Sequence, residues 1–148
     1  MPLSPAGTGA GAVNPRITVI TLGVADVGAA LAFYRDGLGF RVGAVKGEIT
    51  YFDAGGAWFC VYPRGKLARY AGVPAKGEGF SGVTLSSNVD SQQAVDEMMA
   101  RAKVAGAEIV RAPAAVSWGG YTAWFRDPDG HLWEVVWNPR PFVGVADG

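Results

Sequence analysis

The sequence predicts an α+β fold built from two βαβββ modules that pack about a pseudo-two-fold axis. Three observations support this fold class. Glycine accounts for 22 of 148 residues, about double its usual frequency of roughly 7%, which indicates many tight turns and argues against a long helical bundle. Short apolar stretches alternate with two stretches of helical periodicity. The order of these stretches in the first half recurs in the second.

The first half has the order β-α-β-β-β. A β-branched stretch at 17–24 predicts a strand, and Asp26 stands where a helix N-cap is expected. Apolar residues then recur at helical spacing, and Gly37 and Gly39 end the helix. The residues on that apolar face are Val27, Ala30, Leu31, Tyr34 and Leu38. Three further strands are expected at 40–45, 49–53 and 58–62.

The second half repeats this order. A strand is expected at 81–86, followed by Asp90 as the helix N-cap, with Gln93 placed as in a capping box, and Gly106 as the helix stop. The expected buried face of this helix consists of Ala94, Val95, Met98, Ala102 and Ala105. The remaining strands are expected at 108–111, 121–126 and 132–137, with a turn at 127–130 between the last two.

The repeat sets the predicted domain organisation. Aligning Gly56 with Gly130 places AWFCVYP over HLWEVVW. We therefore expect one domain at 16–140, made of modules 16–63 and 80–140 and a linker at 64–79. Two such sheets curving toward each other would enclose a central cavity. Residues 1–15 and 141–148 are expected to be disordered tails.

Composition excludes several classes of function. Lys+Arg and Asp+Glu are both 13, so the neutral chain lacks the positive charge that nucleic-acid or anionic-membrane partners require. No apolar run is long enough to span a membrane, and no signal peptide is recognisable, so a cytoplasmic protein is expected. Cys60 and His131 are the single residues of their types, which excludes internal disulfides and zinc clusters of several Cys and His.

Two motifs resemble one family. LGVADVGAALAFYRDGLGF (22–40) is similar to the opening module, and FRDPDGHLWEVVW (125–137) to the closing hairpin, of the vicinal oxygen chelate superfamily. That superfamily contains glyoxalase I, bleomycin resistance proteins and extradiol dioxygenases. The stretch WGGYTAWFRDPDGHLWEVVWNP resembles a bacterial branch described only as glyoxalase-like. The resemblance covers 17–139 and implies a curved sheet around a cavity and a homodimer.

The resemblance also implies four metal-ligand positions. Carried over, these are Val19, Cys60, Gly82 and Glu134. Glu134 alone has an ordinary ligand side chain for a hard divalent cation, and catalytic metals need about three protein ligands. His131 lies an odd number of residues before Glu134 and so faces the other side of the strand. No cofactor is therefore expected, and metal-dependent glyoxalase or dioxygenase chemistry is disfavoured.

The remaining candidate site is the cavity. Alternation along 132–137 places Glu134 on the inner face and turns Trp133 and Trp137 toward the helix. On the neighbouring strand, either Tyr121, Ala123 and Phe125 or Thr122 and Trp124 face Glu134. The residues expected to bind substrate are Trp58, Cys60, Tyr62, Trp118, Tyr121 and Trp124. Each has a structural alternative: the aromatic residues as core, Cys60 as an inert core residue, His131 as a hairpin residue and the basic linker as solvated surface.

Several functions stay open at this point. The first is a metal-free binding protein of the bleomycin-resistance type that holds a small aromatic or cationic molecule. The alternative is a lyase or isomerase that uses Glu134 as general base, since burial would raise the pKa of that carboxyl. A divalent metal held by unusual ligands is a third hypothesis, and a purely structural module is a fourth.

Overall fold

A computed structural model describes residues 17–140, so both predicted tails lie outside the described residues. The first module consists of β1 (Val19–Val24), α1 (Val27–Leu31), the π-helical turn η2 (Ala32–Gly37), β2 (Arg41–Lys46), β3 (Ile49–Asp53) and β4 (Trp58–Pro63). The second consists of β5 (Leu85–Val89), α3 (Gln92–Ala105), β6 (Glu108–Ala115), β7 (Tyr121–Arg126) and β8 (Leu132–Trp137). Helix α2 (Arg64–Ala71) lies between them.

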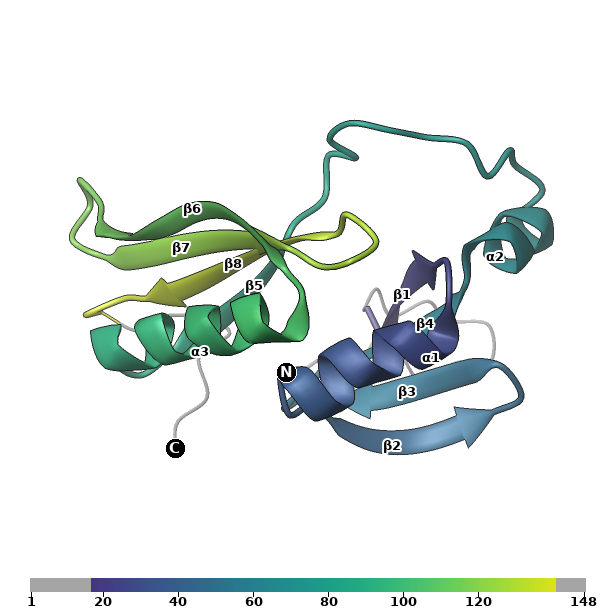
Figure 1. Ribbon diagram of the computed structural model, residues 1–148, viewed down its shortest axis with the longest axis horizontal. Helices are drawn as coiled ribbons and strands as arrows, with labels where there is room; N and C mark the ends of the chain where they lie inside the picture. Colours follow the sequence, from purple (N-terminus) through teal and green to yellow (C-terminus); the bar gives the residue numbers. More distant parts are fainter. Residues whose placement is uncertain (1–16, 141–148) are drawn as a thin grey trace, which may run out of the picture.

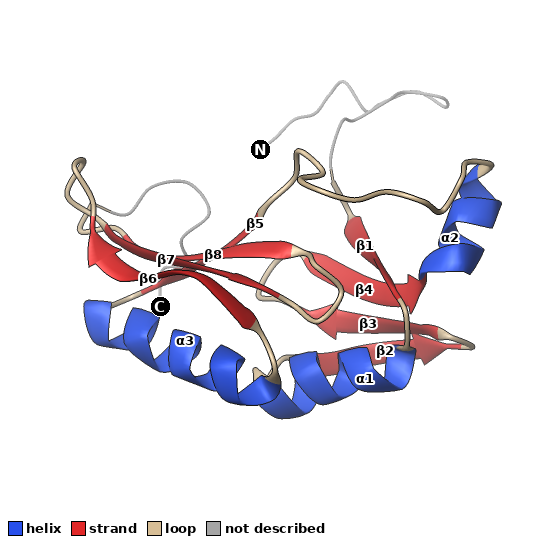
Figure 2. Cartoon of the chain, turned by 45° about the horizontal axis from the view of Figure 1, so that its top comes forward, coloured by secondary structure: helices blue, strands red, loops and turns tan. Residues whose placement is uncertain are grey.

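The predicted α+β fold of two βαβββ modules is confirmed. The two sheets have the equivalent strand orders β1-β4-β3-β2 and β5-β8-β7-β6, each with its first strand parallel to its last. The modules lie side by side (Figure 1), and α1 and α3 lie against the same side of the two sheets (Figure 2). Each sheet therefore has a helix-covered face and a second face, which we call the open face.

The start of the second module differs from the prediction. The strand expected at 81–86 begins at Leu85, because Gly82 has a φ of +84° and breaks the extended chain before it. The expected cap Asp90 is also wrong. Ser91 is extended and its hydroxyl accepts the Ala94 N–H at 3.0 Å, so it caps α3 in the way that Asp26 caps α1.

Three elements differ in extent. The expected linker begins with α2, a helix of 8 residues with no fully buried residue, which is too short to show a sustained apolar stripe in the sequence. Strand β6 runs four residues further than predicted, to Ala115. The helix after Asp26 changes from α to π geometry at Ala32, where it buries Phe33 and Tyr34.

One apolar core extends through both modules. Phe33 and Tyr34 of η2 pack with Phe52 and Phe59 of the first sheet and with Trp133 of the second. The expected core positions of Trp133 and Trp137 are confirmed, since Trp133 is buried and Trp137 packs against the cluster. On α3 the most buried apolar side chains are Val95, Met99 and Ala102, so Met99 replaces Met98 in the predicted face.

The turn between β7 and β8 connects the modules. Tyr34 Oη donates to the buried Asp127 Oδ2 at 2.5 Å, and Trp133 Nε1 donates to Tyr34 Oη at 3.0 Å. The Ala25 N–H donates to Asp129 Oδ1 at 2.8 Å, and His131 Nε2 lies 2.8 Å from Gly23 O. Asp127 Oδ1 also accepts the N–H groups of Asp129 and His131, as expected for a turn. The turn that the sequence explains locally thus also joins the end of β1 to the second module.

Candidate functional site

The open face of the second module carries Glu134. Ala123 and Phe125 are fully buried in the core beneath the sheet, so alternation turns Thr122 and Trp124 to the open face. Trp124 is the direct cross-strand partner of Glu134. This resolves the two alternatives left by the sequence: Glu134 shares its face with Trp124 and not with Phe125.

Glu134 is half-buried and has one hydrogen-bond partner among residues 17–140. The Ser86 hydroxyl donates to Glu134 Oε1 at 3.1 Å, across the parallel pair β5–β8 in which the two residues are partners. Glu134 Oε2 accepts no hydrogen bond from another described residue. One carboxylate oxygen is therefore oriented by Ser86, and the other is available to a ligand or a proton.

The first module has the equivalent pair. Thr21 and Cys60 are partners across β1–β4, with 3.2 Å between Thr21 Oγ1 and Cys60 Sγ. The Cys60 thiol is free and buried. Tyr51 is the partner of Cys60 on the other side, in β3. The pseudo-symmetry of the fold thus relates a Thr–Cys pair to a Ser–Glu pair.

Two of the four positions carried over from the family are not direct strand partners of Cys60 and Glu134. Val19 pairs with Trp58, so the residue beside Cys60 is Thr21. Gly82 lies before β5, so the residue beside Glu134 is Ser86. Those two positions were counted back from the helix caps, whereas strand register decides which side chains meet.

These four side chains do not fit a catalytic divalent metal. They offer one carboxylate, one buried thiol and two hydroxyls, whereas such a metal needs about three strong protein donors. Within 17–140 there is no group of three His, Cys, Asp or Glu side chains placed to hold a metal ion. The donor chemistry of the site, with Glu134 as its single carboxylate, therefore gives no route through a metal.

The predicted substrate-binding residues fall into two groups. Trp58, Cys60, Tyr62 and Trp124 point to the open faces, because Phe59, Val61 and Phe125, their neighbours along the strands, point into the core. Trp118 lies in the turn between β6 and β7, where its ring covers the position that a Cβ at Gly120 would take, and it is 50% exposed.

Tyr121 does not belong to the open face. Its ring packs against the core beside α3, and its hydroxyl donates to Asp96 Oδ1 at 2.8 Å. This hydrogen bond to a carboxylate, together with partial desolvation, raises the pKa of Tyr121. Tyr121 is therefore a sheet-to-helix contact and lies apart from the predicted binding residues on the open face.

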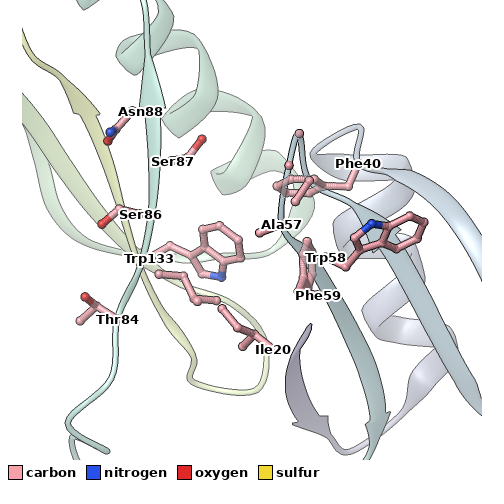
Figure 3. Close-up of a pocket in the computed structure, with 14 residues that line it drawn as sticks. Ile20, Phe40, Ala57, Trp58, Phe59, Thr84, Ser86, Ser87, Asn88 and Trp133 are labelled. Carbon is pink, nitrogen blue, oxygen red and sulfur yellow. The ribbon is translucent and has the colours of Figure 1, made fainter. Parts of the chain in front are cut away.

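A hollow lies between the two modules, where the sequence predicted a central cavity, but its lining differs from the predicted one. This inter-module groove encloses about 640 Å³ between β5 on one side and β4 with the turn 54–57 on the other (Figure 3). Its lining residues are Ile20, Phe40, Ala54, Gly55, Gly56, Ala57, Trp58, Phe59, Thr84, Leu85, Ser86, Ser87, Asn88 and Trp133. Glu134 does not line it. No local pattern predicts this set of lining residues, because the two walls come from different modules.

Comparison with known proteins decides the family. The family model described as Glyoxalase/Bleomycin resistance protein/Dioxygenase superfamily matches residues 16–135. The chain belongs to this superfamily. The resemblance carried by 22–40 and 125–137 is thereby confirmed. A comparison with curated proteins found no match.

Solved structures of superfamily members share the fold. A glyoxalase-related enzyme from Fulvimarina pelagi is 31% identical, with 84% of this chain and 88% of that chain covered and a TM-score of 0.77. A glyoxalase/bleomycin resistance protein/dioxygenase family enzyme from Burkholderia phytofirmans is 21% identical over 81% and 96%, with a TM-score of 0.74. A lactoylglutathione lyase from Agrobacterium tumefaciens is 24% identical over 85% and 96%, with a TM-score of 0.63.

In this superfamily member, none of the helices within 17–140 combines the length and apolar character needed to cross a membrane.

Proposed function

We propose that this superfamily member binds a small aromatic or cationic molecule on its open face, with Glu134 as the charged anchor and without a metal. The observation that carries the proposal is the half-buried Glu134 carboxylate directly opposite Trp124. An indole face attracts a cation, and a carboxylate beside it adds a charge-assisted hydrogen bond. Ser86 holds Oε1 in place, so the anchor is oriented before a ligand arrives.

The charge of Glu134 is tested with a matched pair of probes. Benzamidinium and benzamide have nearly the same shape, but only the first is a cation. Because an ion-paired hydrogen bond contributes about 1.5–3 kcal/mol, Glu134→Gln is expected to weaken benzamidinium binding by about tenfold or more. Benzamide affinity should not change. Both are measured by calorimetric titration of the whole chain.

The control variant is Glu108→Gln, which removes an exposed carboxylate of the same sheet that pairs with Arg126. It should leave both affinities unchanged. If Glu134→Gln affects neither probe, or weakens both equally, Glu134 is not the charged anchor and the proposed function is wrong.

The second candidate function is a lyase or isomerase with Glu134 as general base. The specific observation in its favour is that Oε2 accepts no hydrogen bond within 17–140, while Oε1 is held by Ser86. Such a base would exchange a carbon-bound substrate proton with solvent. Incorporation of deuterium from D₂O into α-hydroxyketones, followed by NMR, should then be lost in Glu134→Gln. Exchange that persists in this variant rejects the mechanism.

We also propose that two copies of the chain assemble and complete the site. Large apolar side chains are exposed along 70–83, with Tyr70 at 90% and Phe80 at 69% exposure, beside Val73 and Val83. Apolar side chains gathered in this way are typical of association surfaces. Sedimentation is expected to give twice the chain mass of 15.4 kDa.

The variant Tyr70→Asp/Phe80→Asp should shift this species toward the single-chain mass at unchanged far-UV circular dichroism. A wild-type chain that sediments at 15.4 kDa at micromolar concentration contradicts the assembly. An assembly that both aspartates leave intact would place the interface elsewhere and contradict the role of 70–83.

A further inference from the structure

We infer that the inter-module groove is a second ligand site, specific for a flat, neutral molecule with a hydrogen-bond donor and an acceptor along one edge. This site is separate from the proposed site at Glu134 and does not depend on it. The inference rests on three features: an apolar floor that is already formed, a wall made of the Ser87 hydroxyl and the outer edge of β5, and a lining without charge.

The floor of the groove is a set of packed aromatic rings. Phe40 and Phe59 meet edge to face with centroids 5.1 Å apart, and Trp133 lies 5.9 and 5.8 Å from them. Trp133 is further held through its hydrogen bond to Tyr34. In Figure 3 the rings of Trp133, Phe40 and Phe59 gather around the opening, with Ile20 close to Trp133. A ligand ring would meet a rigid apolar surface, so little ordering entropy is lost on binding.

The opposite wall comes from β5 and the residue before it. Of the β5 residues that line the groove, Ser87 points toward the opening and supplies a hydroxyl, whereas the side chains of Ser86 and Asn88, like that of Thr84, point to the other side of the strand (Figure 3). Strand β5 is the outer strand of its sheet, so one edge of its backbone has no partner strand among residues 17–140. Free peptide groups of such an edge add donors and acceptors in a row. This wall can hydrogen-bond the rim of a ligand whose face lies on the aromatic floor.

The lining sets the class of ligand. All fourteen lining residues are uncharged, and a charged ligand would lose hydration without gaining an ion pair. The volume of about 640 Å³ falls in the range typical of small-molecule sites. The rim at Gly55 and Gly56, both with positive φ, lacks side chains that would close the entrance. A neutral fused-ring lactam has the required shape and edge chemistry.

The test uses isoquinolin-1-one as the neutral probe and N-methylisoquinolinium as its cationic counterpart. Proton–nitrogen NMR spectra of the full chain should show the neutral probe shifting the amide signals of Ser86, Ser87 and Asn88 and the indole signal of Trp133. The cation should leave these signals unchanged. Absence of these shifts at millimolar isoquinolin-1-one overturns the inference.

Two variants and one control variant test the location. Ala57→Trp places a large side chain in the groove and should weaken the neutral probe by about tenfold or more, while Ala112→Trp, on the exposed part of β6, should change its affinity less than about twofold. Ser87→Ala removes one hydroxyl of the wall and should weaken the probe by about threefold or more without filling space. Unchanged affinity in Ala57→Trp and Ser87→Ala overturns the assignment.

Glu134→Gln separates the two proposals. It should leave isoquinolin-1-one affinity unchanged in the groove while it weakens benzamidinium on the open face. If the neutral probe binds the groove and benzamidinium does not depend on Glu134, the groove site stands and the proposed function fails. The reverse result rejects the groove site alone.

Discussion

Replacing Asp127 by alanine is expected to lower the free energy of unfolding by about 3 kcal/mol, because a buried network then loses its central acceptor. Asp127 is 4% exposed and accepts the Tyr34 hydroxyl at 2.5 Å. It also accepts the N–H groups of Asp129 and His131 at 2.9 and 2.8 Å. The variant leaves the buried Tyr34 O–H without an acceptor and loosens the turn that joins the end of β1 to the second module.

Urea unfolding followed by tryptophan fluorescence measures this loss. The control is Asp36→Ala, which removes an exposed carboxylate paired with the neighbouring Arg35 and should change stability by less than about 0.5 kcal/mol. If the free energy of unfolding falls no further in Asp127→Ala than in Asp36→Ala, the contacts of the turn with the first module do not stabilise the protein.

The same network makes stability depend on alkaline pH. Burial, followed by the charge of Asp127 and its hydrogen bond, raises the pKa of Tyr34 above its ordinary value near 10. Above that value the unfolded chain releases the Tyr34 proton while the folded chain keeps it, so stability present at lower pH is lost as pH rises. The urea midpoint of the wild-type chain should decline between about pH 9 and 11, the range around this ordinary pKa. The decline should be smaller in Tyr34→Phe. An identical decline in both proteins would contradict this.

Replacing Gly37 by alanine is expected to destabilise the fold by about 2 kcal/mol through overpacking. A Cβ at Gly37 would overlap the methyl group of Ala105, where η2 of the first module meets α3 of the second. Neither helix can relax freely, since Phe33 and Tyr34 on one and Ala102 on the other are buried in the shared core. The substitution therefore forces the two modules apart.

Gly65→Ala is the matched control. Gly65 lies in α2, and a Cβ there would meet nothing within 4 Å. Alanine should stabilise this exposed helix by about 0.5 kcal/mol, because it favours the helical backbone. Ala105→Gly combined with Gly37→Ala should recover most of the loss if overlap of the two methyl groups is its cause. Failure of this double variant to recover stability would reject the steric explanation.

The sequence by itself determined the elements of this protein. Helix periodicity after Asp26, the stops at Gly39 and Gly106 and the turn at 127–130 depend on neighbours in the chain, so local propensity is sufficient. The repeat then determined the two-module α+β architecture, and the motifs at 22–40 and 125–137 determined the family. The alternation of side chains along β8 was enough to place Glu134 on the face of the strand that points away from the core, on which Trp133 lies.

The tertiary structure alone decided which side chains meet. Thr21 rather than Val19 lies beside Cys60, and Ser86 rather than Gly82 lies beside Glu134, because register belongs to a pair of strands and not to either one. The face that Trp124 shares with Glu134 depended in the same way on the core beneath β7. The inter-module groove and the contacts of Asp127 join residues nearly a hundred positions apart, and no local pattern records such distances.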